Sequence, residues 1–68
     1  YMDNIGCLEL DISLYKKQPK YAKRAYGSYA DLRNRILKKL RYHERLKKIN
    51  IISIVENVDF LIIKWEIL

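Results

Sequence analysis

Tyrosine side chains are interleaved with lysines and arginines in the middle of this chain, a pattern typical of proteins that bind polyanions. The residues between positions 16 and 26 with this character are Lys16, Lys17, Lys20, Tyr21, Lys23, Arg24 and Tyr26. Cations at this density neutralise phosphates and release condensed counterions, and tyrosine rings stack on unpaired bases. The segment therefore predicts a nucleic-acid-binding arm, with simple solvation of these side chains as the alternative.

A second set of cations follows at helical spacing. The members that share one face of the predicted helix, or lie at its border, are Arg35, Lys38, Arg41, Tyr42, Arg45 and Lys48. Such a face can follow a phosphate backbone or enter a major groove, whereas the alternative is a solvated helix back. The spacing does not select DNA over RNA, and it does not distinguish base contacts from phosphate contacts.

The charge of the chain is segregated along the sequence. The 68 residues carry a net charge of +6. Residues 16–48 hold thirteen lysines and arginines against two carboxylates, a net charge of +11, while the flanks hold one lysine against six carboxylates, a net charge of −5. A basic middle between acidic ends predicts a polarised surface that attracts nucleic acid.

Metal-dependent and nucleophilic chemistry has few candidates in this sequence. Cys7 and His43 are the only residues of their types, and they are too far apart to show the spacing of a zinc site. Glu9 and Asp11 share the polar face of a predicted strand, where carboxylates are usually solvated. His43 falls on the apolar stripe of a helix, so we expect it to be packed and hydrogen-bonded at the core edge. We predict no catalytic residues, no metal and no other cofactor.

The segment AYGSYADLRNRI, residues 25–36, resembles the second signature of the GIY-YIG nucleases. In that family a glycine is followed eight positions later by a catalytic arginine on a helix, and Gly27 and Arg35 match this spacing. The final segment, DFLIIKWEIL, is similar to the apolar stretch that carries the family's metal-binding glutamate. Three positions lack the side chain that the family has there: Leu8, Ala25 and Lys64. The resemblance implies a degenerate nuclease as a remote alternative.

The elements that must position these residues begin with a strand. Residues 7–15, CLELDISLY, alternate strictly between apolar and polar side chains, which predicts a half-buried β-strand. The apolar side chains on its buried face are Leu8, Leu10, Ile12 and Leu14. Residues 16–27 then form a basic arm, in which Pro19 favours a short helix over 20–26 that Gly27 ends.

A long amphipathic helix is predicted over residues 29–48. Ser28 and Asp31 fit the N-cap and the third helical position of a capping box. The stripe expected to face the core consists of Tyr29, Leu32, Ile36, Leu40, His43 and Leu46. Because a glycine inside a helix costs only about 1 kcal/mol relative to alanine, one continuous helix over 20–48 is an alternative.

The C-terminal third predicts a β-hairpin of residues 51–55 and 60–68. A helix over 60–68 is the alternative, because short apolar runs are ambiguous. The side chains expected on one face are Leu61, Ile63, Trp65 and Ile67. The apolar side chains left on the other face, and predicted to form an interface with a second copy or a partner protein, are Phe60, Ile62 and Leu68.

Together these elements predict one small α+β domain with two layers in the order β-α-β-β, in which a long amphipathic helix packs on a small antiparallel sheet. The lone cysteine and the lack of an apolar run of about 18 residues favour a cytoplasmic protein without a membrane segment. We expect a small basic nucleic-acid-binding protein, DNA- or RNA-binding, that is a homodimer or has a partner protein. The second hypothesis is an interaction or assembly subunit that uses the apolar C-terminal strand.

Overall fold

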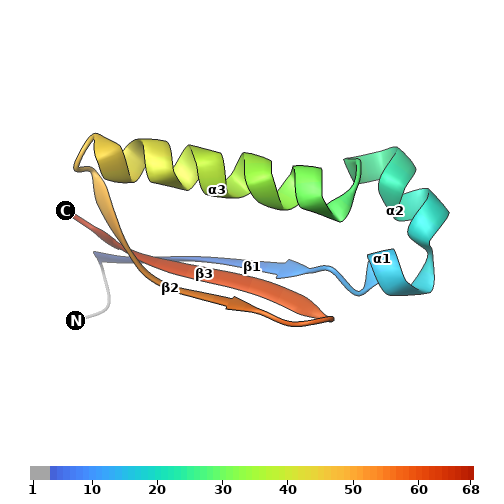
Figure 1. Ribbon diagram of the computed structural model, residues 1–68. Helices are drawn as coiled ribbons and strands as arrows, with labels where there is room; N and C mark the ends of the chain where they lie inside the picture. Colours follow the sequence, from blue (N-terminus) through green and yellow to red (C-terminus); the bar gives the residue numbers. More distant parts are fainter. Residues whose placement is uncertain (1–3) are drawn as a thin grey trace.

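A computed structural model describes residues 4–68 as a helical layer on a three-stranded antiparallel sheet (Figure 1). This confirms the predicted α+β arrangement. The elements in chain order are β1 (Ile5–Asp11), α1 (Leu14–Lys17), α2 (Pro19–Tyr26), α3 (Tyr29–Arg45), β2 (Ile49–Glu56) and β3 (Phe60–Ile67). The helices form one layer and the strands the other, so the two faces of the molecule are built from different parts of the sequence.

The last strand of the chain, β3, lies in the centre of the sheet, which has the order β1-β3-β2. Both neighbours pair with it antiparallel, so its backbone is hydrogen-bonded on two sides and the alternative of a C-terminal helix is wrong. Leu61 and Ile63 are fully buried, and Leu10 and Leu8 lie opposite them on β1. The core is therefore centred on β3, beneath α3.

Strand β1 is shorter than predicted, because it ends at Asp11 instead of continuing to Tyr15. The backbone N–H and the hydroxyl of Ser13 both donate to Oδ1 of Asp11, at 2.9 and 2.6 Å. Both hydrogen bonds lower the pKa of the Asp11 carboxyl, and the bond from the hydroxyl has the larger effect. A side chain that binds the backbone two residues later favours a turn. Leu14 and Tyr15 therefore belong to the short helix α1 despite the strand-like alternation of the sequence.

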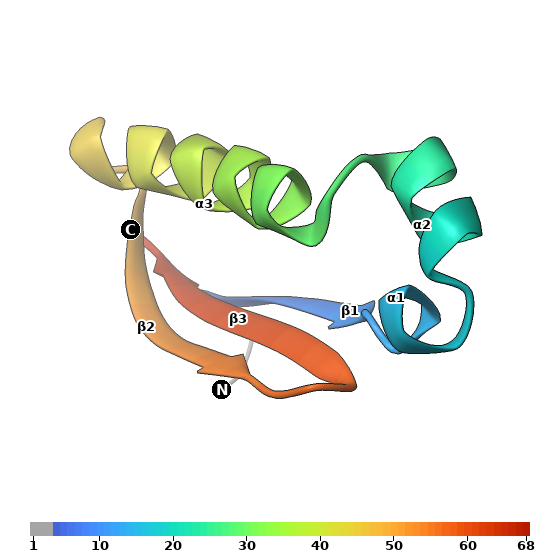
Figure 2. The same cartoon turned by 45° about the vertical axis from the view of Figure 1, so that its right-hand side comes forward.

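The helical region is bent at Gly27, so the alternative of one continuous helix is wrong (Figure 2). Pro19 is the first residue of α2, and Gly27 ends it with a φ of 82°, in the left-handed region that favours glycine. The Tyr15 hydroxyl donates to the carbonyl of Gly27 at 2.9 Å. Ser28 then accepts a hydrogen bond from the backbone N–H of Asp31 at 3.2 Å, which confirms the predicted N-cap of α3.

Helix α3 ends at Arg45, three residues before the predicted boundary. Lys47 has a φ of 60°, which reverses the chain so that Lys48 leads into β2. The prediction that His43 and Leu46 face the core is wrong, because both are exposed. His43 instead contacts the ring of Tyr42 edge-on, with ring centroids 5.8 Å apart.

The orientation of α3 is set by polar contacts with β2 that the apolar pattern does not reveal. Glu44 accepts a hydrogen bond from the backbone N–H of Ile51 at 3.0 Å. At the other end of the helix, the hydroxyl of Tyr29 donates to Glu56, and Nε of Arg33 lies 3.0 Å from the same carboxylate. These contacts attach both ends of the helix to β2. Leu46, which was predicted on the apolar stripe, follows the helix and is exposed.

Candidate nucleic-acid interface

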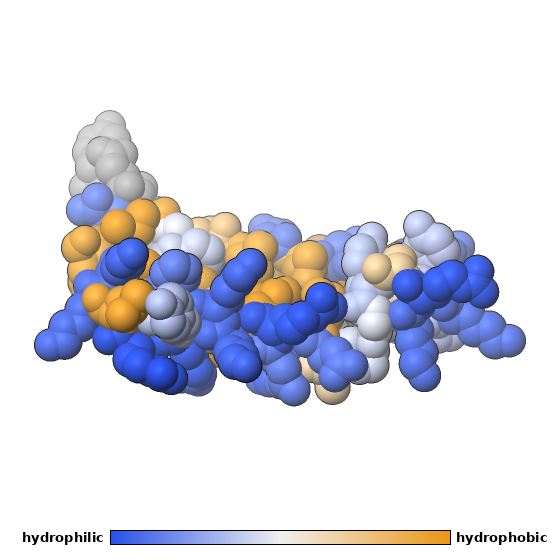
Figure 3. Space-filling view, turned by 90° about the horizontal axis from the view of Figure 1, so that it is seen from above, coloured by the Kyte–Doolittle hydropathy of each residue, from blue (hydrophilic) through white to orange (hydrophobic). Residues whose placement is uncertain are grey.

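The predicted nucleic-acid-binding residues are all exposed and all belong to the helical part of the chain or to the turn that follows it. Helix α1 ends with Lys16 and Lys17, and helix α2 carries Lys20, Tyr21, Lys23, Arg24 and Tyr26. Helix α3 carries Arg35, Lys38, Arg41, Tyr42 and Arg45, and Lys48 lies in the turn that follows it. Figure 3 views this layer from above, and hydrophilic side chains dominate the lower edge and the right-hand end of the picture. The helical layer therefore carries the basic charge of the molecule.

The outer face of α3 holds its cations in one row. Lys38, Arg41 and Arg45 recur at intervals of three and four residues, a spacing that brings side chains together on one face of a helix. The helical rise places the first and last about 10 Å apart along the axis. Because phosphates of one strand in a duplex are spaced by about 3.4 Å along the axis, this row matches the length of about three nucleotides.

Within residues 4–68, carboxylates neutralise little of the basic charge. In the part of the chain from residue 4 onward, the one ion pair joins Arg33 to Glu56, and both side chains are about one third exposed. The Tyr29 hydrogen bond and the nearby Arg33 lower the pKa of Glu56. Two effects raise the pKa of Tyr29 to about 12: burial of its hydroxyl, which is the larger, and the contact with Glu56. This cluster joins α3 to β2, and among residues 4–68 the other lysines and arginines have no ion-pair partner.

Arg35 has a structural contact in addition to its exposed position. Its Nη2 donates to the carbonyl of Tyr26 at 2.7 Å, and its Nε donates to the carbonyl of Asp31 at 3.4 Å. The guanidinium therefore binds the last carbonyl of α2 and stabilises the bend before α3. This is the arginine that matches the nuclease signature. Over residues 4–68, no group of three or more histidine, cysteine or acidic side chains is arranged to hold a metal ion.

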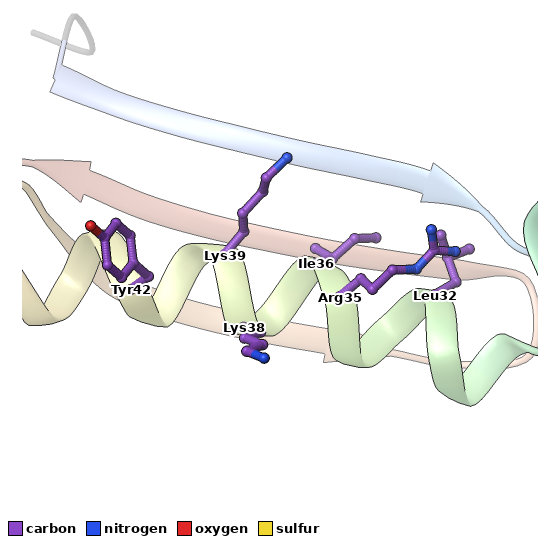
Figure 4. A pocket seen from close by; sticks show the side chains of 6 residues that line it. All are labelled: Leu32, Arg35, Ile36, Lys38, Lys39 and Tyr42. Atoms are coloured by element: carbon purple, nitrogen blue, oxygen red, sulfur yellow. The ribbon is translucent and has the colours of Figure 1, made fainter.

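A groove of about 540 Å³ runs along one flank of α3 (Figure 4). We call it the flank groove, and its lining residues are Leu32, Arg35, Ile36, Lys38, Lys39 and Tyr42. Leu32, Ile36 and Lys39 point from α3 toward the β1 side of the sheet. Lys39 was missing from the predicted site because it lies between the apolar stripe and the cationic face. Its spacing from Leu32, Ile36 and Tyr42 is the sequence signal that could have identified this flank.

The predicted interface residues lie on or beside the face of the sheet that is turned away from the helices. Phe60 is 40% exposed, Leu68 is 68% exposed and Ile62 is half-buried. Strand β2 adds the exposed side chain of Val55, which the prediction did not include. A bulge between Ile51 and Ser53 shifts the register of β2, and Val55 then lies opposite Ile62. The apolar character of this face is thus broader than the sequence alone indicated.

Comparisons with protein-family models, with curated protein sequences and with solved structures find no match to this chain. Within residues 4–68, none of the helices combines the length and the apolar character needed to span a membrane. Function is therefore inferred from the surface of the molecule itself.

Proposed function

We propose that this chain is a small basic nucleic-acid-binding protein without enzymatic activity. The observation that carries the proposal is the helical layer, where the predicted cations are exposed and, among residues 4–68, only Arg33 has a carboxylate partner. Thirteen of the fourteen lysines and arginines lie between residues 16 and 48. A nucleic acid supplies the regularly spaced negative charge that such a surface attracts.

Two parts of this layer contribute to binding in different ways. The row of Lys38, Arg41 and Arg45 follows a phosphate backbone along α3. The arm formed by α1 and α2 adds further phosphate contacts, and the exposed rings of Tyr21 and Tyr26 offer stacking surfaces. Affinity comes mainly from phosphate contacts, because cations on this surface neutralise phosphate charge. Such contacts position a ligand without reading its sequence.

The decisive experiment compares two variants that each lose one positive charge from opposite layers. Arg41→Gln removes a cation from the outer face of α3, whereas Lys64→Gln removes one from the sheet. Fluorescence anisotropy with a labelled oligonucleotide should show several-fold weaker binding for Arg41→Gln and for the double variant that also carries Arg45→Gln. Lys64→Gln should remain within about twofold of the wild type, because screening weakens charges farther away than about 10 Å at 0.1 M salt.

Equal losses in Arg41→Gln and Lys64→Gln would show that net charge, and not the α3 face, determines binding. That result would contradict the proposed site. A failure of the wild-type protein to bind duplex DNA, single-stranded DNA or RNA at low salt would contradict the function itself. Circular dichroism of each variant verifies that the fold is retained.

A second candidate function is that of an assembly subunit, which the exposed apolar face of the sheet favours. Phe60 is 40% exposed and Val55 is 51% exposed, on the same face of the sheet as Ile62. Clustered apolar side chains on a small domain mark interaction surfaces, and a second copy stacked on this face would cover them. Sedimentation velocity at increasing concentrations should show a dimer that Val55→Asp disrupts. A monomer at every concentration tested would contradict this second function.

A further inference from the structure

The flank groove combines an apolar wall with a cationic rim. Leu32 and Ile36 are half-buried and form its wall, while the side chains of Lys38 and Lys39 are exposed beside them. Tyr42, which is 55% exposed, lines the same groove. At about 540 Å³ the groove lies within the range of about 300–1,000 Å³ that is usual for small-ligand sites. The groove therefore suits a ligand that has both flat apolar parts and negative charge.

The apolar surface continues beyond the groove toward the bend between α2 and α3. A second hollow of about 160 Å³ shares Leu32 with the flank groove and is also lined by Leu10, Tyr15 and Tyr26. Tyr26 is 48% exposed, so a half-exposed tyrosine lines each of the two hollows that Leu32 borders. Leu32 and Tyr42 are about 15 Å apart along the axis of α3, from the helical rise. This path is long enough for more than one stacked group.

We infer that the flank groove binds unpaired bases, and that the nucleic acid which this protein prefers is single-stranded. The inference depends on the proposed nucleic-acid-binding function and specifies its ligand. In a single strand the bases are free to enter the groove and stack on Tyr42, while the phosphates stay outside near Lys38 and Lys39. In a duplex the base faces are stacked and paired, so the apolar wall would have nothing to bind.

Charge decides between this ligand and a second copy of the chain. Two flank grooves packed together would bring Arg35, Lys38 and Lys39 of both copies into proximity, and like charges at an apolar interface oppose association. A polyanion instead gains from these cations along its whole length, including those of the neighbouring arm. An acidic peptide with apolar side chains would also match the charge, and its binding is one outcome of the test below.

The test uses the whole chain and a labelled single-stranded oligonucleotide of about 16 nucleotides, the upper end of site sizes known for single-strand-binding domains. A duplex of the same sequence is the comparison, measured by anisotropy at the same salt concentration. We expect the single strand to bind at least tenfold more tightly. Tyr42→Ala should weaken single-strand binding by about 5- to 150-fold, the range for loss of one stacked base, and should weaken duplex binding less than single-strand binding. Tyr42→Phe keeps the ring and should stay near the wild type.

A second measurement does not depend on substitution. In a ¹³C-methyl NMR titration of the wild type, the methyl resonances of Leu32 and Ile36 should shift with the single strand and not with the duplex. Equal affinity for both nucleic acids, with no effect of Tyr42→Ala, would overturn the inference and leave the proposed function intact. Binding of neither nucleic acid would overturn both. If the groove binds an acidic apolar peptide but no single strand, the inference is wrong as well.

Discussion

Replacing Gly6 by alanine tests the packing that holds the two outer strands on β3. Gly6 lies opposite Trp65 in the β1–β3 register, and a Cβ atom built on it would overlap the indole ring. The backbone of Gly6 has no unusual φ, so the cost of the substitution comes from the overlap alone. The ring must move away, which exposes part of a residue that packs against the core.

The expected magnitude follows from two opposing effects. Forcing an extra methyl group into a packed site usually costs about 1–3 kcal/mol. Replacing glycine by alanine within a regular element recovers about 0.5–1 kcal/mol of conformational entropy. The two effects leave a net cost of about 0–2.5 kcal/mol. Because the added Cβ atom would fall on the indole ring itself, we expect Gly6→Ala to lower the free energy of unfolding by about 1–2 kcal/mol, a large share of the stability of so small a domain. Urea unfolding followed by circular dichroism measures this quantity.

A double-mutant cycle isolates the cause. In a Trp65→Leu background the ring is absent, so Gly6→Ala should become neutral or slightly stabilising, and the coupling free energy should be about 1–3 kcal/mol. If Gly6→Ala is as stable as the wild type with Trp65 present, the indole does not lie over Gly6. An equal destabilisation in both backgrounds would place the cause in the backbone, and it too would refute the reasoning.

Three further predictions concern the other contacts that fix the fold. Leu61→Ala should lower the free energy of unfolding by about 2–5 kcal/mol in a urea titration, because Leu61 is fully buried on the central strand; a loss below 1 kcal/mol would place the core elsewhere. Ser28→Ala should cost about 1 kcal/mol by removing the N-cap of α3, whereas Ser28→Asp should retain most of the stability; equal losses would contradict the cap. Because the pKa of Glu56 is lowered in the folded state, its contribution to stability is present above the unfolded pKa of about 4.3 and is lost as the pH falls through the lower folded value. Acid unfolding of Glu56→Gln should thus depend less on pH than that of the wild type, and an unchanged dependence would argue against its contacts with Tyr29 and Arg33.

Local sequence signals were sufficient for the main elements of this fold. The cap at Ser28, the stop at Gly27 and the apolar run of β3 each depend on residues close together in the chain. The strand predicted to reach Tyr15 failed because Asp11 binds Ser13, a side-chain contact that period-two alternation does not encode. A turn of this kind is favoured by the residue types alone, so a closer reading of that segment could have placed it.

The orientation of α3 could not be predicted, because contacts between distant parts of the chain determine it. Glu44 binds the backbone of Ile51, and Glu56 binds Tyr29 and Arg33. Polar pairs of this kind have no periodic signature, so the apolar stripe does not predict them. Helical spacing predicts that the cations of α3 are exposed, as they are, but it does not predict the groove beside them.

The most direct test of the proposed function is the salt dependence of binding by the wild-type protein. Three phosphate contacts from Lys38, Arg41 and Arg45 alone correspond to a slope of about −2.1 for log K against log salt concentration on a single strand, and of about −2.7 on a duplex. Contacts from the α1–α2 arm add to this, so we predict a slope steeper than −2 on a single strand in an anisotropy titration at several salt concentrations. A slope near zero, or no measurable binding at low salt, would contradict the account.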